Sequence, residues 1–417
     1  MYKLSKSDRT LKGEIKLTAS KSESNRALII SALSKMPITL HNLATAKDTQ
    51  TLIEVLQQDE KNYKENIEYN IGAAGTTMRF LTAYFATKPG TRILTGSERM
   101  KQRPIKPLVE ALKQLGADIT YLEKEGYPPL KIKGKILTGN EVTIDGSLSS
   151  QYITALLLIS PQLYNGLVLH FNGGTTSKPY INMTLKMMEY FNVSGTWEDD
   201  DICVSNQQYK TEENKPYTIE ADWSAASYWY SMAALADDVD LKIFGLKENS
   251  LQGDSIVKDF YTFFGVKTTF IEGGVHLTKI KPVIMALGFD FSDCPDVAQT
   301  ILVSASALQI PVLMNGLHTL KIKETDRIAS MIIELKKLGI EAAETFTNTI
   351  EIKEYARTLT QTQVPIATYD DHRMAMSFAP LAFKYESITI ENPEVVNKSY
   401  PAFWDDMKSV GFKIEEL

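Results

Sequence analysis

The chain has 417 residues, a length that favours two or three domains of about 150 residues each. Hydrophobic residues make up 43% of it and charged residues 23%, which is ordinary for a globular protein. The net charge of −6 argues against a general nucleic-acid binder, because such proteins are usually basic. The two cysteines, Cys203 and Cys294, are too few for a disulfide framework or for a metal site built from cysteines alone.

Neither the first residues nor the most apolar stretch resembles a targeting or membrane segment. The opening MYKLSKSDRTLKGEIKL is too polar for a secretion signal. Residues 153–171 are apolar, but Pro161, Gln162 and Asn165 interrupt them, so they do not read as a membrane span. We therefore expect a cytoplasmic protein that does not associate with membranes.

The first predicted helix begins near Lys21, where Ser20 and Glu23 have the spacing of a capping box. Its later residues, 27–33, are small or apolar and predict burial. Ser22 and Arg26 lie four residues apart and share a face of the helix. Since a helix N-terminus carries free N–H groups and a partial positive charge, this end is a candidate anion site.

Four later segments of the first half also place polar donors at the start of an apolar helix. Each of them alone is better read as a helix cap or a solvated face, but their recurrence indicates a shared binding function. The donors are Gly75, Thr76, Thr77 and Arg79; Arg99, Lys101, Arg103 and Lys106; Ser149, Ser150 and Gln151; and Ser177, Lys178 and Tyr180.

The second half adds charges of both signs at predicted helix starts. Two anion sites with carboxylates between them suit the joining of one phosphorylated compound to another, since acid–base groups must move protons while cations hold the moving charge. The residues are Asp296; Lys323 and Glu324, before a helix capped by Thr325 with Arg327 in its first turn; Asp371 as a cap, followed by His372 and Arg373; and Lys398.

Several common cofactor motifs are absent from the sequence. It contains no G-x-G-x-x-G, Walker phosphate loop, H-E-x-x-H or C-x-x-C. These absences disfavour a nicotinamide cofactor, an ATP site of the usual kind and a structural zinc.

One local pattern recurs along the chain: an amphipathic helix, then Gly or Asn, then a short alternating strand. The Gly or Asn positions are separated by 76, 73, 74 and 72 residues, and a weaker helix at 48–58 lies roughly one unit before the first. A Gly or Asn at this point fits a left-handed C-terminal cap. The spacing predicts an α/β (α+β) protein of about six copies, three per domain. The recurring positions are Gly116, Asn192, Gly265, Gly339 and Gly411.

The last copy extends to the end of the chain, so an N-terminal piece is needed to complete the C-terminal domain. We predict crossings between domains near residue 20 and shortly after residue 217. One domain then comprises residues 20–220, and the other comprises residues 1–19 together with 221–417.

Taken together, these motifs resemble the 5-enolpyruvylshikimate-3-phosphate synthase family, the 3-phosphoshikimate 1-carboxyvinyltransferases. The resemblance implies a two-domain enolpyruvyl transferase fold, an inside-out α/β barrel with three βαβαββ copies per domain and the active site in the cleft between the domains. The motifs occur in the family's order from residue 20 to residue 401: SKSESNRAL, AGTTMR, MKQRPI, SSQYITALL, SKPYI, DWSAASYW, PDVAQ, KETDR, DHRMAM and NKSYP.

The resemblance implies transfer of the enolpyruvyl group of phosphoenolpyruvate to the 5-hydroxyl of shikimate 3-phosphate through a tetrahedral intermediate. This step of the shikimate pathway leads to chorismate and the aromatic amino acids, and it implies no metal, cofactor or nucleic acid. By the same resemblance Asp296 is the base, Glu324 is the acid and Lys21 contacts both substrates. Shikimate 3-phosphate is bound by Lys21, Ser22, Arg26, Ser149, Ser150, Gln151, Ser177, Asp296 and Lys323. Phosphoenolpyruvate is bound by Lys21, Gly75, Arg103, Gln151, Arg327, Arg373 and Lys398.

Two residues depart from the common pattern of the family. Ala73 stands where many relatives carry Asn or Ser, and Phe80 is larger than the residue of some relatives. Both lie near Gly75, in the pocket that the resemblance assigns to phosphoenolpyruvate.

We expect the protein to be a monomer.

Two alternatives remain to be weighed. The sister UDP-N-acetylglucosamine enolpyruvyl transferases typically have Lys followed by Asn at the first helix and a reactive Cys in the basic loop. Here Ser22 follows Lys21, and no cysteine lies between residues 90 and 110. A ring-forming nucleic-acid clamp also repeats α/β units, but it requires basic residues spread over all copies, whereas the cations here concentrate beside Asp296 and Glu324.

Overall fold

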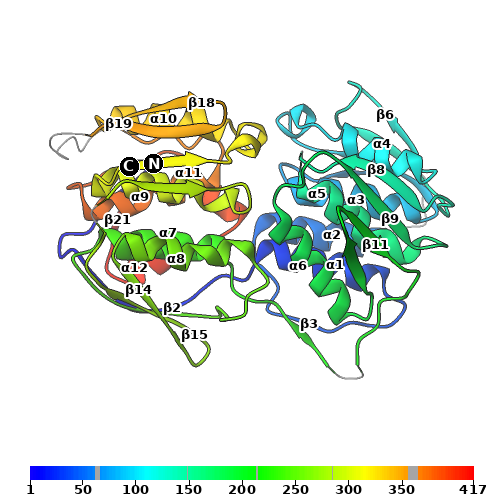
Figure 1. The fold of residues 1–417 in the computed structure, drawn as a ribbon, viewed down its shortest axis with the longest axis horizontal. Helices are drawn as coiled ribbons and strands as arrows, with labels where there is room; N and C mark the ends of the chain where they lie inside the picture. The colour runs from blue at the N-terminus through cyan, green and yellow to red at the C-terminus, as the bar shows by residue number, and fades with distance from the viewer. Residues whose placement is uncertain (62–65, 148, 213–214, 284, 356–364) are drawn as a thin grey trace. The chain divides into compact units, whose positions relative to one another are not determined.

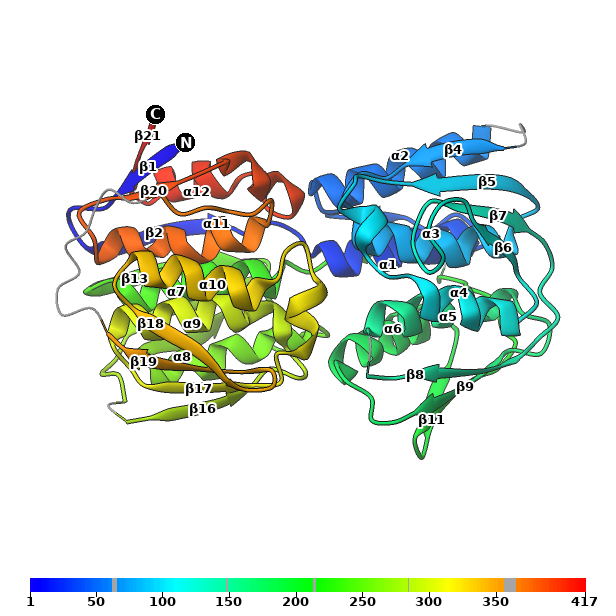
Figure 2. The same cartoon turned by 90° about the horizontal axis from the view of Figure 1, so that it is seen from above.

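The computed structural model describes residues 1–61, 66–147, 149–212, 215–283, 285–355 and 365–417. The chain divides into two compact units, which can be followed by colour in Figures 1 and 2. The discontinuous unit consists of Met1–Ala19 and Glu220–Leu417, and the inserted unit is Ser20–Ile219.

Four sheets of four strands share one topology, which confirms the predicted α/β class and the βαβαββ repeat. In each copy the first two strands run parallel, and the fourth strand lies between the second and the third in antiparallel pairing.

Two complete copies lie in the inserted unit. The first comprises β4 (Ile67–Asn70), α3 (Gly75–Thr87), β5 (Gly90–Thr95), η1 (Met100–Gln102), α4 (Lys106–Gln114), β6 (Asp118–Tyr121) and β7 (Leu130–Gly134). The second comprises β8 (Glu141–Asp145), α5 (Ser150–Ile159), η2 (Ser160–Gln162), β9 (Leu167–Asn172), α6 (Lys178–Tyr190), β10 (Gly195–Glu198) and β11 (Asp201–Val204).

The other two complete copies lie in the discontinuous unit, where β2 pairs with β13 across a long sequence separation. One comprises β2 (Thr10–Lys16), α7 (Trp223–Leu235), β13 (Asp238–Phe244), η3 (Gly253–Ile256), α8 (Val257–Phe263), β14 (Val266–Ile271) and β15 (Gly274–Lys279). The other comprises β16 (Leu287–Asp290), η4 (Pro295–Val297), α9 (Ala298–Leu308), β17 (Val312–Asn315), η5 (His318–Ile322), α10 (Arg327–Lys337), β18 (Glu341–Phe346) and β19 (Thr349–Glu354).

The remaining two copies are abbreviated within the part of the chain that the structure describes. In the discontinuous unit β1 lies between β20 and β21, and Ile366 bridges Ile390 in the place of a first strand. This copy comprises α11 (His372–Phe378), η6 (Ala379–Phe383), β20 (Ile388–Ile390), η7 (Pro393–Lys398), α12 (Phe403–Ser409), β21 (Lys413–Glu416) and β1 (Tyr2–Ser5). In the inserted unit the other copy comprises α1 (Lys21–Leu33), β3 (Leu40–His41), α2 (Lys47–Lys61) and β12 (Tyr217–Thr218), with β3 parallel to β12.

In each unit the most buried helices lie inside, and the sheets lie outside them (Figure 2). We call these the inner helices: α1, α3 and α5 in the inserted unit, and α7, α9 and α11 in the discontinuous unit. Every residue of α7 except Ser224 is buried, and α7, α9 and α11 pack on one another. Burying each large apolar side chain contributes about 1.5–3 kcal/mol. This is the expected inside-out arrangement, although the described strands form six separate sheets and no closed barrel.

Hydroxyl groups link the inner helices of the discontinuous unit at positions one repeat apart. Ser227 of α7 lies 3.1 Å from Thr300 of α9, and Thr300 lies 3.3 Å from Ser377 of α11. One turn further on, the hydroxyls of Ser231 and Ser304 are 2.8 Å apart. Small hydroxyl residues therefore let the helices approach closely while each buried polar group keeps a partner. No helix among the described residues has both the length and the apolar content to cross a membrane.

The residues that follow the recurring helices adopt the predicted left-handed conformation. Their φ angles are 95° at Gly116, 66° at Asn192, 85° at Gly265, 77° at Gly339 and 90° at Gly411. A strand follows each of them, so the spacing seen in the sequence marks one helix-to-strand turn of each copy.

Gly116→Ala is expected to destabilise the protein by about 1 kcal/mol, because the left-handed conformation costs a non-glycine residue roughly 1–2 kcal/mol. Space is not the limit, since a Cβ at Gly116 would come no closer than 3.7 Å to Thr138. Gly288→Ala in β16 is the matched control: a Cβ there meets nothing within 4 Å, and the residue has no positive φ. Urea unfolding should therefore show a lower midpoint for the first variant only, and equal midpoints would contradict the cap.

Candidate active site

Three of the predicted donors are the first residues of inner helices of the inserted unit. Lys21 begins α1, Gly75 begins α3 and Ser150 begins α5. Ser20 caps α1 as predicted, its Oγ accepting from the Glu23 N–H at 3.3 Å, whereas the Glu23 carboxylate accepts from the Tyr217 hydroxyl at 2.6 Å. These helix starts bring free backbone N–H groups and partial positive charge to the candidate site.

Lys21 has a carboxylate partner that the sequence reading did not assign. Its Nζ lies 3.4 Å from Oδ2 of Asp48, a buried residue in the first turn of α2. Asp48 belongs to the weak helix noted at 48–58, so the periodicity located the helix but not the role of this residue.

The Arg26 guanidinium is buried and already bonded inside the unit. Its Nε donates to Thr184 Oγ1 at 2.8 Å and its Nη1 donates to the Ser22 carbonyl at 2.8 Å. Its Nη2 donates to Thr154 Oγ1 at 3.3 Å and to the Tyr180 carbonyl at 3.2 Å. Burial lowers the pKa of Arg26 to about 10, which keeps it charged at neutral pH. Of the five guanidinium N–H groups, one on Nη1 has no acceptor among the described residues and can donate to a ligand.

Phe80, one of the departures from the family pattern, packs beside this arginine. Its side chain is 1% exposed, and its ring centroid lies 5.8 Å from the Arg26 guanidinium carbon. The larger residue therefore contributes a cation–π contact to the arginine's surroundings.

Gly75 lies directly beside the Arg103 guanidinium. A Cβ at Gly75 would stand 2.6 Å from Arg103 Nη1. Arg79 links the helix start at Gly75 to the residue after Arg103, because it donates to the Gly75 carbonyl at 3.0 Å and to the Pro104 carbonyl at 3.0 Å. A glycine is thus needed here for close approach rather than for a special backbone angle.

The family resemblance implies that Gly75 and Arg103 bind phosphoenolpyruvate, and on that expectation Gly75→Ala should raise the KM for this donor about 10- to 100-fold. Displacing Arg103 weakens one charge-assisted hydrogen bond worth about 1.5–3 kcal/mol. Folding stability should barely change, since the clash falls on the movable end of a side chain. The KM for shikimate 3-phosphate serves as the internal reference in steady-state kinetics. An equal rise in both KM values would show a general distortion instead.

The remaining predicted residues of the inserted unit also stand at helix starts. The Oγ of Ser149 caps α5, accepting from the Gln151 N–H at 3.3 Å, and Gln151 Nε2 donates to Thr76 Oγ1 at 3.4 Å. Ser177 precedes α6 in a left-handed conformation with φ 57° and is 5% exposed. These contacts fix the backbone around the hydroxyl groups.

Arg327 is the central cation of the discontinuous unit. It is the first residue of α10 and is 1% exposed. Its Nε lies 2.7 Å from Asp371 Oδ2, its Nη2 lies 2.9 Å from Glu324 Oε2, and its Nη1 lies 3.2 Å from Asp296 Oδ1. Burial alone would lower the pKa of Arg327, but Asp371 and Glu324 raise it above its usual value.

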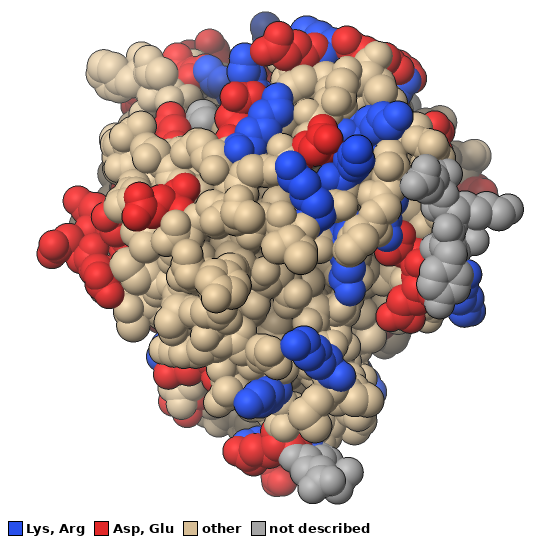
Figure 3. All heavy atoms as spheres, turned by 90° about the vertical axis from the view of Figure 1, so that its right-hand side faces the viewer, with Lys and Arg blue, Asp and Glu red and all other residues tan. Residues whose placement is uncertain are grey.

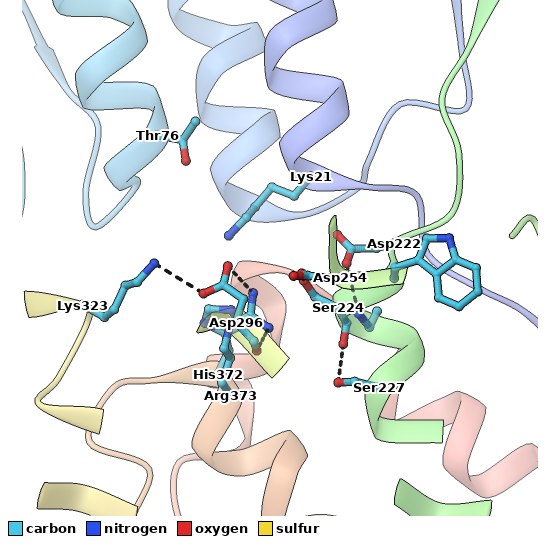
Figure 4. Close-up of polar contacts among 12 residues, drawn as sticks. Lys21, Thr76, Asp222, Ser224, Ser227, Asp254, Asp296, Lys323, His372 and Arg373 are labelled. Carbon is cyan, nitrogen blue, oxygen red and sulfur yellow. Dashed lines mark hydrogen bonds and ion pairs between the residues drawn. The ribbon is translucent and has the colours of Figure 1, made fainter. Parts of the chain in front are cut away.

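The Asp296 carboxylate is surrounded by cations (Figure 4). Besides Arg327, its Oδ1 lies 3.4 Å from Lys323 Nζ, and its Oδ2 lies 3.0 Å from Arg373 Nη2. Arg373 Nη1 also donates to the Asp296 carbonyl at 2.9 Å. Burial alone would raise the pKa of Asp296, but Arg373 and Lys323 hold it well below its usual range.

Glu324 pairs with two cations on different elements. Its Oε2 meets Arg327, and its Oε1 lies 2.9 Å from the Nζ of Lys398 at the end of η7. The two predicted acid–base residues, Asp296 and Glu324, are thus held by the same arginine.

The structure corrects one predicted cap and adds roles for residues read only as caps or core. Thr325 does not cap α10. Asp326 caps it, its carboxylate accepting from the Ala329 N–H at 3.1 Å. A carboxylate is at least as good a cap as a threonine hydroxyl, and the Thr325 hydroxyl instead lies 3.1 Å from the Ser330 hydroxyl. Asp371 caps α11 as predicted and also holds Arg327.

Among the described residues no group of three or more His, Cys, Asp or Glu side chains is arranged to hold a metal ion. The arrangement instead consists of carboxylates paired with lysine and arginine, which suits acid–base chemistry on anionic substrates.

Comparisons with known proteins agree over nearly the whole chain. The family described as EPSP synthase (3-phosphoshikimate 1-carboxyvinyltransferase) matches residues 6–407. A 3-phosphoshikimate 1-carboxyvinyltransferase of Bacteroides fragilis is 48% identical over 97% of this chain and 97% of its own, and one of a Sulfurovum species is 36% identical over 96% and 97%. The EPSP synthase structure from Acinetobacter baumannii shares the fold with a TM-score of 0.76 at 19% identity, covering 100% of this chain and 99% of that one. The chain therefore belongs to the EPSP synthase (3-phosphoshikimate 1-carboxyvinyltransferase) family.

Proposed function

We propose specific roles for the site residues in the reaction of this family. The chain is an enzyme of the shikimate pathway that transfers the enolpyruvyl group to shikimate 3-phosphate, a step toward the aromatic amino acids. Its substrates are small molecules, and the donor in the proposed scheme is phosphoenolpyruvate.

Shikimate 3-phosphate would be held mainly by helix starts of the inserted unit. Ser22, Ser149 and Ser177 offer hydroxyls there, while the α1 and α5 termini supply free N–H groups. Because four of its N–H groups are already used, Arg26 would add charge and one direct hydrogen bond. The complete proposed set is Lys21, Ser22, Arg26, Ser149, Ser150, Gln151, Ser177, Asp296 and Lys323.

Phosphoenolpyruvate would be held by cations that now pair with the catalytic carboxylates. Arg327 and Arg373 contact Asp296, and Arg327 and Lys398 contact Glu324. The two anionic groups of the donor, its carboxylate and its phosphate, would take the place of these carboxylates beside the cations. This pairing is the observation that best supports the scheme. The complete proposed set is Lys21, Gly75, Arg103, Gln151, Arg327, Arg373 and Lys398.

The chemistry would proceed by addition and elimination. Asp296 takes the proton of the 5-hydroxyl while the oxygen of this hydroxyl bonds to C2 of phosphoenolpyruvate. Glu324 gives a proton to the C3 methylene. The tetrahedral intermediate then loses phosphate as the bond from C2 to the phosphate oxygen breaks. Glu324 recovers a proton from the new methyl group, and the proton on Asp296 leaves with phosphate. Lys21, held by Asp48, would stabilise the charge on the substrates.

Phosphate release tests the acceptor directly. The purified protein is mixed with phosphoenolpyruvate and either shikimate 3-phosphate or UDP-N-acetylglucosamine. We expect release only with the shikimate ester. Release only with the nucleotide sugar would overturn the proposed acceptor site.

The two alternatives have little physical support. Burial raises the pKa of both cysteine thiols, Cys203 and Cys294, so neither is an activated thiolate of the kind expected in the sister enzymes. On the face drawn in Figure 3, Lys and Arg lie among Asp and Glu and do not form the continuous basic surface of a nucleic-acid clamp.

We also propose that the enzyme acts as a monomer in the cytoplasm. Both cysteines are free, which suits a reducing compartment. Light scattering coupled to size-exclusion chromatography should give a mass close to that of one chain, and twice that mass would contradict the monomer.

A further inference from the structure

A basic cavity lies in the discontinuous unit, and none of the proposed active-site residues lines it. Its volume is about 590 Å³, within the range of about 300–1,000 Å³ typical of small-molecule sites. The turn between β1 and β2 forms one side, and the segment between η6 and β20 forms another. Its lining residues are Lys3, Ser5, Lys6, Ser7, Arg9, Phe383, Lys384, Tyr385, Glu386, Ser387, Lys413 and Glu415.

The charges of this cavity are not balanced. Five of the lining residues are cations and two are carboxylates. Lys6 pairs with Asp8, and Lys413 pairs with Glu415. For Lys3, Arg9 and Lys384, by contrast, the described part of the chain provides no ion pair.

Two of these cations also repel each other. Burial lowers the pKa of Lys384, and the nearby Arg9 acts in the same direction. Asp237 is the carboxylate that opposes this effect, but it also faces Lys279. Asp237 is therefore shared between two lysines, and an added anion would relieve the repulsion between Lys384 and Arg9.

A buried hydroxyl provides an independent sign of a missing partner. Tyr385 lines the cavity and is 4% exposed, yet its hydroxyl has no hydrogen-bond partner among the described residues. Buried polar groups are rarely left unpaired, because the loss costs about 1–3 kcal/mol. The hydroxyl is itself buried, so a ligand that accepts a hydrogen bond would satisfy it once the Tyr385 side chain rotates toward the cavity.

We propose that this cavity binds the phosphate group of a small phosphorylated metabolite, with Arg9, Lys384 and Lys3 as its cations and Tyr385 as a hydroxyl donor. A phosphate dianion matches the uncompensated charge, and the cavity leaves room for a small organic group attached to it. The site is separate from the transfer reaction and does not depend on the proposed roles of Asp296 and Glu324.

Equilibrium dialysis with radiolabelled orthophosphate at constant ionic strength tests the proposal. The wild type should bind one more phosphate per chain than the Arg9→Gln/Lys384→Gln variant, which should nevertheless retain enolpyruvyl transfer. The matched control is Lys267→Gln/Lys281→Gln, which removes the same charge from exposed positions outside the cavity. It should bind phosphate like the wild type.

Two further measurements sharpen the outcome. Tyr385→Phe should weaken phosphate binding several-fold without destabilising the free protein, because the hydroxyl has no partner to lose. Glycerol 3-phosphate should compete with orthophosphate, and failure to compete would overturn the proposal that the ligand is a phosphorylated metabolite. The same phosphate stoichiometry in the wild type and the Arg9→Gln/Lys384→Gln variant would overturn the proposal, as would an equal loss in the control.

Discussion

Glu324→Gln is expected to lower kcat for enolpyruvyl transfer by about 10²–10⁴-fold, the usual contribution of a general acid–base group. The amide retains the size of Glu324, and its single oxygen can still accept from one of the two cations, Arg327 or Lys398, which now lie 2.9 Å from the two carboxylate oxygens. It cannot, however, give a proton to the C3 carbon or recover one. The loss should therefore appear in kcat and leave the binding of shikimate 3-phosphate unchanged.

Single-turnover kinetics and calorimetric titration with shikimate 3-phosphate would separate these two effects. Glu344→Gln is the matched control, since Glu344 also pairs with a lysine, Lys321, at 2.8 Å in the same unit but outside the site. A near-normal kcat for Glu324→Gln would remove this residue from the mechanism. Loss of shikimate 3-phosphate binding would instead assign it a structural role.

The repeat could be predicted from sequence because its signal is local. Gly116, Asn192, Gly265, Gly339 and Gly411 end helices in a conformation that favours Gly or Asn, and all of them adopt it. Strand pairing was harder to predict from the sequence. β1 lies between β20 and β21 because it forms hydrogen bonds with the opposite end of the chain, and no short sequence pattern encodes such pairing.

The candidate site shows the same division between local and tertiary information. The helix starts near Lys21, Gly75, Ser150 and Arg327 were evident from polar donors followed by apolar runs. The capping residue itself was predicted correctly for the helix at Lys21 but not for the helix at Arg327. The three-carboxylate arrangement around Arg327 was not evident from the sequence.

The three carboxylate partners of Arg327 come from different elements. Asp296 lies in η4, Glu324 follows η5, and Asp371 caps α11. Asp371 looked complete as a helix cap in the sequence. Only the tertiary structure shows that its second oxygen holds Arg327.

Asp296→Asn is expected to have opposite effects on turnover and on donor binding. Turnover should fall by about 10²–10⁴-fold, since an amide cannot take the proton of the 5-hydroxyl. The affinity for phosphoenolpyruvate should rise, because Arg373 and Arg327 lose the carboxylate that now competes for them at 3.0 and 3.2 Å. A tenfold gain corresponds to about 1.4 kcal/mol, a modest share of the attraction between charges at such distances.

Donor affinity can be measured without turnover by calorimetry in the presence of a shikimate 3-phosphate analogue that lacks the 5-hydroxyl. Glu341→Gln removes the same charge from an exposed position of β18 and should leave the dissociation constant of phosphoenolpyruvate unchanged. Arg327 keeps Asp371 and Glu324 as partners in the Asp296→Asn variant, so the protein should remain folded. Weaker donor binding in a folded Asp296→Asn variant would show that Asp296 orients the cations rather than competing for them. Tighter binding with lost turnover would mean that the donor displaces this carboxylate and thereby frees it to act as the base.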